Sequence, residues 1–220
     1  MKKIMFNDKY GLTEAVLTGN KTMTRRMVKL TLHTKDKEGV FTEISPDKMF
    51  FNEEGVAMFE VNGNVYQVPK ESQPAYKIGE EVAVAQSYQT VYDAIEERDG
   101  NSKANEWWSR LCDRSPKNPQ FLQGYRNKMF TAAELMPYRL KITNIKAERL
   151  QDISDNDCFA EGVRTVFDTE YGKWYCHVVG FEWLFDTCQE AFAALIDRIS
   201  GRGAWEANPW VYAYEFELIK

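Results

Sequence analysis

The strand that decides the fold is Tyr138-Arg139-Leu140-Lys141-Ile142-Thr143-Asn144-Ile145, in which apolar and polar residues alternate. Alternation with a period of two places every second side chain on the same face of a sheet. The segment 210–218 alternates in the same way and is rich in aromatic residues. Between these segments, an apolar stripe at helical spacing predicts a helix over 182–200, ended by Gly201. We expect both strands to belong to one curved sheet, with the helix packed against the domain.

The flanking sequence predicts further strands and short helices. Asn62-Gly63 separates two apolar segments, as in a two-residue hairpin turn. Ser154 and Gly162 are typical of the two ends of a short helix, and Gly19 of the end of another. The expected strands lie near 28–32, 57–61, 65–68 and 82–85, and the expected helices near 12–17, 104–112 and 155–161.

Three stretches are predicted to be long insertions, at about 40–73, 89–128 and 164–181. The first contains the two strands of the hairpin, and the second contains the helix near 104–112. The last of these is rich in aromatic residues and can also be a hairpin. The sequence therefore predicts a single domain over 1–220 of mixed α/β (α+β) class, with a β-rich core.

Composition excludes several classes of protein. The 220 residues include 30 aromatic ones, and 28% are charged, which argues against intrinsic disorder. The longest apolar run, 191–196, is far too short to span a bilayer, and no apolar segment follows Lys2 and Lys3 as in a signal peptide. We expect a cytoplasmic protein without a membrane partner; the oligomeric state stays open.

The formal net charge is −5, so no overall positive field attracts nucleic acid. Six basic residues nevertheless lie between Asn20 and Lys37, and six more between Gly124 and Arg149. If these two segments lie on one face of the molecule, they would form a local phosphate-binding patch. The alternative is scattered, solvated charge.

The four cysteines contain no C-x-x-C pair, and together with the two histidines they show no zinc-ligand spacing. Cys176 and His177 are adjacent, a spacing that rarely directs both side chains to one metal. We therefore expect reduced, partly buried thiols, no metal site and no cofactor.

The segment Gly19-Asn20-Lys21-Thr22-Met23-Thr24-Arg25-Arg26 has the densest chemistry. It follows a helix-ending glycine and offers backbone amides, two hydroxyls and three cations. Such groups can bind a phosphate or a base edge. The alternative is a solvated basic loop.

Gly19-x-Lys21-Thr22-x-Thr24-x-Arg26 after a short helix resembles the signature of the ASCH superfamily, whose members are PUA-like β-barrels. Three further segments resemble this family in the same order: 76–82, 139–163 and 208–216. The resemblance implies a PUA-like β-barrel with short flanking helices. The length and the insertions are similar to those of longer members, many of them encoded by phages or prophages.

The resemblance also implies a cleft near the loop from Gly19 to Arg26 for RNA, a nucleotide or a modified nucleoside. We take this binding role as the leading hypothesis. The implied ligand contacts are Lys21, Thr22, Thr24, Arg25, Arg26 and Gln86. Gln86 belongs to Ala85-Gln86-Ser87-Tyr88, where longer members often have Arg-Glu-x-Trp.

An alternative is a metal-independent hydrolase, either a ribonuclease or an amidohydrolase. Small bacterial members hydrolyse N4-acetylcytidine with a lysine, a threonine and a glutamate, which would be Lys21, Thr24 and Glu161 here. A threonine hydroxyl needs a neighbouring base, and lysine is one when desolvation or nearby arginines lower its pKa. Glu161 can orient the lysine or move a proton. A second alternative is a phage or prophage accessory protein whose insertions bind another protein.

The aromatic residues of the insertions also have two interpretations. Trp107, Trp108, Trp174 and Trp183 can be stacking platforms for bases, or can pack the insertions onto the core.

Overall fold

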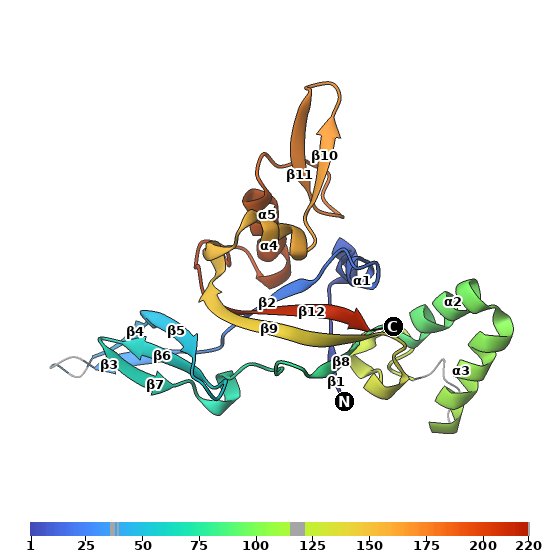
Figure 1. The fold of residues 1–220 in the computed structure, drawn as a ribbon, viewed down its shortest axis with the longest axis horizontal. Coiled ribbons are helices and arrows are strands. Elements are labelled where there is room, and N and C mark those ends of the chain that lie inside the picture. The colour runs from blue at the N-terminus through green and yellow to red at the C-terminus, as the bar shows by residue number, and fades with distance from the viewer. Residues whose placement is uncertain (36–37, 39, 115–121, 220) are drawn as a thin grey trace.

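The computed structural model describes residues 1–35, 38, 40–114 and 122–219 (Figure 1). Its centre is a five-stranded sheet in the order β1-β8-β9-β12-β2. The strands are β1 (Lys2–Ile4), β2 (Met23–Met27), β8 (Glu81–Val84), β9 (Arg139–Arg149) and β12 (Trp210–Ile219). β1 is parallel to β8, and the other neighbouring pairs are antiparallel.

The two alternating segments pair as predicted. In β9, Leu140 and Ile142 are buried while Lys141 and Thr143 are exposed. Leu140 lies opposite Leu218, and Ile142 lies opposite Phe216 in β12. The register shifts between Glu215 and Phe216, and β9 curves along its length (Figure 1). The curved sheet and the mixed α/β class are confirmed. Among the described residues the sheet ends at β1 and β2, so a closed barrel is not shown.

Three helices pack near the sheet: α1 (Leu12–Leu17), α4 (Asp155–Ala160) and α5 (Cys188–Ser200). Ser154 caps α4 as predicted. The predicted start of α5 at 182 is wrong, because Thr187 and Glu190 form a capping box there. The apolar residue Phe185, part of the same stripe, instead pairs with Cys176 in extended conformation.

The first predicted insertion is β-structure packed onto the core. It contributes to the hairpin of β3 (Leu32–Lys35) and β4 (Phe41–Ile44) and forms the sheet of β5 (Lys48–Phe51), β6 (Ala57–Val61) and β7 (Asn64–Gln67). Asn62 and Gly63 both have positive φ, as the predicted turn requires. Met49 and Phe59 join the main hydrophobic core.

The second predicted insertion contains two helices, α2 (Tyr88–Asp99) and α3 (Asn101–Arg114), where the sequence predicted one. Residues 115–121 of it, including the segment from Ser115 to Pro119, lie outside the described residues. Trp107 and Trp108 pack against a separate cluster of buried side chains, and the Trp107 indole donates to the Leu135 carbonyl at 3.1 Å. These two residues therefore pack the insertion onto the core.

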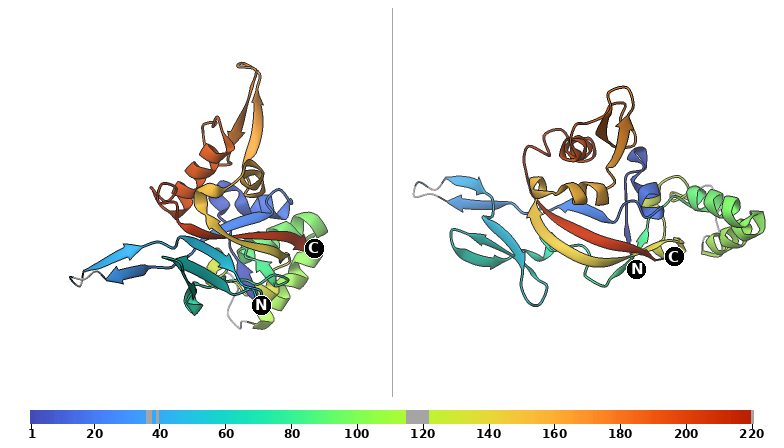
Figure 2. Two further views of the ribbon diagram at one scale, coloured as in Figure 1. Left: turned by 60° about the vertical axis from the view of Figure 1, so that its left-hand side comes forward. Right: turned by 45° about the horizontal axis from the view of Figure 1, so that its top comes forward.

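The third predicted insertion is a hairpin of β10 (Arg164–Asp168) and β11 (Lys173–His177) that projects from the body (Figures 1 and 2). Short 3-10 helices complete the fold at Asp8–Tyr10, Lys70–Ser72, Lys128–Phe130, Ala133–Leu135 and Leu150–Asp152.

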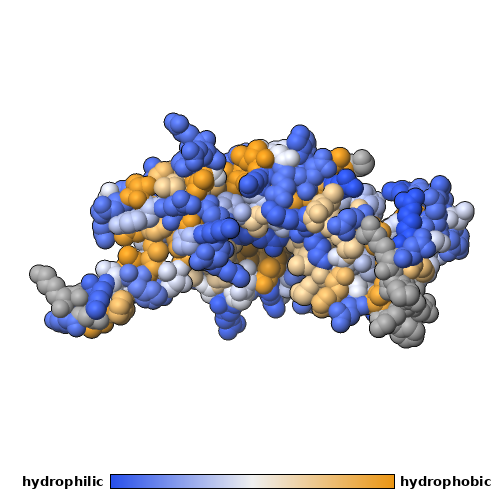
Figure 3. All heavy atoms as spheres, turned by 90° about the horizontal axis from the view of Figure 1, so that it is seen from below, coloured by the Kyte–Doolittle hydropathy of each residue, from blue (hydrophilic) through white to orange (hydrophobic). Residues whose placement is uncertain are grey.

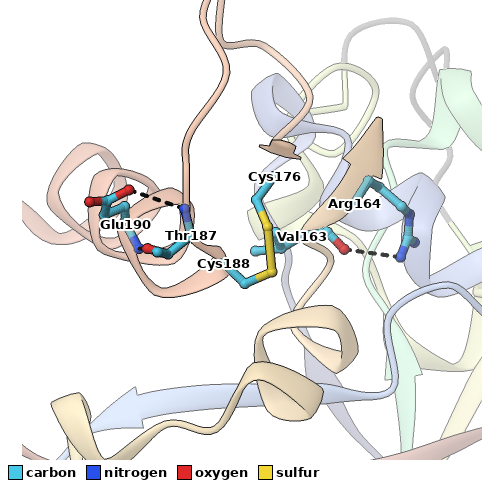
Figure 4. The surroundings of a disulfide bond; sticks show 6 residues. All are labelled: Val163, Arg164, Cys176, Thr187, Cys188 and Glu190. Atoms are coloured by element: carbon cyan, nitrogen blue, oxygen red, sulfur yellow. Dashed lines mark hydrogen bonds between the residues drawn. A yellow bond between two sulfur atoms is a disulfide. The ribbon is translucent and has the colours of Figure 1, made fainter. Parts of the chain in front are cut away.

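A disulfide joins Cys176 at the base of β11 to Cys188 at the start of α5 (Figure 4). The expectation of four reduced thiols is therefore wrong for this pair, whereas Cys112 and Cys158 are free. The pairing of Cys176 with Phe185 returns the chain toward β11, so the two cysteine Cα atoms are 5.2 Å apart. That approach depends on tertiary structure, and no sequence motif marks it.

Within the described ranges, no helix has the length and apolar character needed to cross a membrane. Figure 3 shows one face of the molecule, on which hydrophilic side chains separate several hydrophobic patches.

Candidate functional site

The segment from Gly19 to Arg26 is a turn that leads into strand β2. Gly19 ends α1 with φ of 75°, and the amides of Asn20 and Lys21 both donate to the Ala15 carbonyl. The Thr22 amide donates to the Ala160 carbonyl at 2.9 Å, which ties the turn to the end of α4. The turn is therefore fixed between two helices.

Lys21 and Glu161 form a buried ion pair at this turn. The Lys21 Nζ lies 2.6 Å from Glu161 Oε2 and donates to the Glu161 carbonyl at 2.7 Å. The two residues are 2% and 4% exposed. Burial lowers the pKa of Lys21 below its usual value, and the Glu161 carboxylate partly opposes that effect.

Gly162 lies next to this pair and follows Glu161 in the chain. Its φ of 109° suits glycine, and a Cβ there would lie 3.3 Å from Leu12 and 3.8 Å from the Lys21 side chain. A side chain at this position would therefore crowd Leu12, whereas its contact with Lys21 would be an ordinary one.

Arg25 is surrounded by carboxylates. Its Nη2 lies 2.6 Å from Glu148 Oε1 and 2.7 Å from Asp157 Oδ2, and its Nη1 lies 3.3 Å from Glu161 Oε1. Burial alone would lower the pKa of Arg25, but these carboxylates raise it overall. Two cations thus meet three carboxylates, so Arg25 holds Glu161 in place and has no free charge for a phosphate.

A pocket of about 490 Å³ opens beside this network. Five of the sequence-predicted residues line it together: Lys21, Thr24, Arg25, Arg26 and Glu161. The remaining wall consists of side chains that the sequence analysis did not identify, among them Lys3, Phe6, Lys29, Tyr76, Phe192 and Ile196.

Thr24 and Arg26 face the pocket with unused polar groups. Thr24 is opposite Tyr214 in the sheet, and its hydroxyl makes no hydrogen bond to any described residue. Arg26 donates to the Met5 carbonyl and lies 6.0 Å from the Phe6 ring. Within the part of the chain that the structure describes, no carboxylate pairs with Arg26.

Thr22 and Gln86 do not line this pocket. The Thr22 side chain is exposed, and its backbone groups bond to Ala160 and Phe216. Gln86 is buried between β8 and α2, and its Oε1 has no hydrogen-bond partner among the described residues. The structure therefore separates these two from the other predicted ligand contacts.

The second basic segment is largely neutralised by pairing. Lys128, Arg139, Lys141 and Lys146 lie within ion-pair distance of Asp8, Glu81, Glu217 and Glu215, respectively. Arg149 donates to two backbone carbonyls. This segment thus fits the alternative of scattered charge, whereas Arg26 and Lys29 of the first basic segment lie at the pocket without an ion-pair partner among the described residues.

Comparisons with known proteins give no relative for this chain. No protein-family model matches it, and no curated protein or solved structure does either.

Proposed function

We propose that the pocket beside β2 binds a nucleotide, a modified nucleoside or a segment of RNA. The observation that carries this proposal is an open pocket that combines unpaired cations, a free hydroxyl and apolar walls. A nucleotide requires this combination, because it joins an anionic phosphate to a flat and largely apolar base.

The charges favour an anion at the mouth of the pocket. Arg26 and Lys29 are exposed there and form no ion pair with a described residue. The Lys21 ammonium is already paired with Glu161 inside. A phosphate on Arg26 and Lys29 would gain charge-assisted hydrogen bonds without breaking an existing ion pair.

The interior favours a base. Phe6 and Tyr76 line one part of the pocket, and α5 contributes Phe192, Leu195 and Ile196. The Thr24 hydroxyl and the Glu161 carboxylate are the polar groups that can read a base edge there. The resemblance to the ASCH superfamily supports the same role, and a PUA-like barrel is part of this proposal.

Calorimetric titration with nucleosides and nucleoside 5′-monophosphates tests the proposal. Arg26→Gln removes a charged donor and should weaken binding of a monophosphate by about 1.5–3 kcal/mol. The control is Arg110→Gln on α3, whose exposed side chain lies outside the pocket and pairs with Glu106. Equal affinity of Arg26→Gln and wild type, or no binding by wild type, would contradict the proposal.

A second candidate function is amide hydrolysis of an acylated nucleoside. The observation that favours it is that Lys21, with its lowered pKa, lines the same pocket as the Thr24 hydroxyl. Lys21 would first pass its ammonium proton to Glu161 within the ion pair. The Thr24 oxygen would then attack the acyl carbon while the neutral Lys21 takes the Thr24 proton and passes it to the departing amine. Water would release the acyl group as an acid.

Assays of N4-acetylcytidine turnover test this chemistry. They compare the wild type with Thr24→Ala, Lys21→Ala and the double variant. Either single change should abolish turnover, and the double change should cost no more than one of them. Thr24→Ser keeps a hydroxyl and should retain activity. Turnover by Thr24→Ala, or none by wild type, would rule out the mechanism, and a parallel assay on single-stranded RNA covers the ribonuclease alternative.

A further inference from the structure

A second, smaller hollow of about 220 Å³ lies between the N-terminal segment, the loop before α5, and α5 itself. Its lining includes Lys9, Tyr10, Phe181, Trp183 and Arg198. Neither the network around Lys21 nor the proposed nucleotide pocket uses these side chains.

This hollow combines cations with an exposed aromatic ring. The Arg198 guanidinium lies 5.9 Å from the Trp183 ring and 6.0 Å from the Phe181 ring. The Lys9 ammonium lies 5.6 Å from the Tyr10 ring. Trp183 is 47% exposed, which leaves part of its ring open to solvent.

The charge of the hollow is positive. Lys9 and Arg198 have no ion-pair partner in the described ranges, and Glu182 is the acidic side chain in the lining. Two unpaired cations beside an exposed indole are what a single-stranded nucleic acid needs, with its phosphates on the cations and a base on the ring.

The hollow and the larger pocket have no lining residue in common, but the same two segments of the chain contribute to both. Ile199 and Ser200 line the pocket, and the preceding residue, Arg198, lines the hollow. Asn7 lines the pocket, and Lys9 lines the hollow. Since consecutive Cα atoms are about 3.8 Å apart, the backbones that line the two sites meet within one or two residues at both of these places.

The loop that carries the aromatic wall is held at both ends. The Cys176–Cys188 disulfide closes it (Figure 4). Backbone hydrogen bonds also join Cys176 to Phe185 in both directions. Phe181, Trp183 and Phe185 also contact one another within this loop. The aromatic wall is therefore positioned before any ligand arrives, which lowers the entropy cost of binding.

We infer that this hollow is a second nucleotide subsite, and that the ligand is a single-stranded oligonucleotide spanning both sites. This inference rests on the proposed nucleotide pocket. One nucleotide occupies the pocket beside β2, a neighbouring base stacks on Trp183, and its phosphate contacts Arg198 and Lys9.

Fluorescence anisotropy with labelled hexauridine, competed by uridine 5′-monophosphate, tests the inference. Wild type should bind the hexamer at least tenfold more tightly than the monophosphate. Trp183→Ala and Arg198→Gln should each weaken hexamer binding, by roughly 5- to 100-fold for the lost stacking contact, and leave monophosphate binding unchanged. Arg198→Gln keeps most of the side chain and so guards against a folding defect in Trp183→Ala.

The control is Trp174→Ala, because Trp174 is a 61% exposed aromatic residue on β11 that does not line the hollow. It should bind both probes like wild type. Hexamer binding by Trp183→Ala and Arg198→Gln at the wild-type level would overturn the inference and leave the nucleotide pocket standing. Binding of neither probe by wild type would overturn both proposals.

Discussion

Lys21 and Glu161 are both removed from water and lie 2.6 Å apart, so each compensates the charge of the other. Glu161→Ala would leave the Lys21 ammonium buried without its carboxylate, at a cost of about 3–5 kcal/mol. Urea denaturation should show this loss. In the control, Glu106→Ala removes an exposed partner of Lys103 and Arg110 and should leave the midpoint unchanged. Equal midpoints for Glu161→Ala and wild type would contradict the buried pair.

Because of Tyr214, we expect the stability of the fold to fall at alkaline pH. Burial raises its pKa to about 12, and its hydroxyl accepts a hydrogen bond from the Ala75 amide. Because the pKa is higher in the folded state, stability is intact below the unfolded value of about 10 and is lost as the pH rises toward 12. The loss from this group approaches roughly 3 kcal/mol.

The measurement is the free energy of unfolding at pH 9 and at pH 11.5 for wild type and Tyr214→Phe. Groups whose pKa does not depend on Tyr214, such as Lys21, titrate in both proteins and cancel in the comparison. Wild type should lose more stability across this range than the variant. Parallel losses would show that Tyr214 does not titrate as its burial requires.

At this scale the sequence predicted the site in part. Resemblance alone placed Lys21 beside Glu161, although the two are 140 residues apart. The sequence analysis counted Arg25 as a free cation. The partners of Arg25, Glu148 and Asp157, come from β9 and α4 and reach it only after the sheet has formed. Nothing in the sequence around Gln86 could show that this residue lies outside the pocket lining.

The disulfide belongs to the scale of elements, since it joins β11 to α5 across 12 residues of sequence. Closing a loop of this length restricts the unfolded chain and stabilises the fold by up to about 3 kcal/mol. The double change Cys176→Ser and Cys188→Ser should therefore lower the free energy of unfolding. Cys112→Ser, at a free cysteine on α3, is the control and should match wild type. Identical stability of wild type with and without a thiol reductant would contradict this role.

The predictability of each element follows from its burial. β9 begins with alternating buried and exposed residues because one of its faces is packed, so its pattern was visible in the sequence. β12 is buried on both faces from Val211 to Tyr214, and its signal was the aromatic residue at every second position. α2 buries Tyr88 and Val91 and is otherwise more exposed, so it shows no apolar stripe. The stripe before α5 misled the prediction because Phe185 packs against the core in extended conformation and Leu184 is 40% exposed, so neither belongs to the helix.

At the scale of the whole molecule, a net charge of −5 coexists with a local positive surface at the pocket. Oligonucleotide affinity should fall as salt rises, by a slope of about −0.7 per phosphate neutralised on a single strand. Neutralising Arg26 and Lys29 together should flatten this slope. The control is Lys141→Gln on β9, because Lys141 is not part of the pocket lining. This variant should keep the wild-type salt slope. An unchanged slope in the double variant would place the phosphate contacts elsewhere.

The central claim is that a nucleotide binds beside β2, and amide chemical-shift mapping by NMR tests it most directly. On titration with uridine 5′-monophosphate, the largest shifts should fall on Met5, Phe6 and Asn7, on β2, and on Tyr76, which together surround the pocket. Amides of α2 and α3, which lie outside the lining, should not move. Shifts concentrated on α2 and α3, or no shifts at saturating nucleotide, would contradict the account.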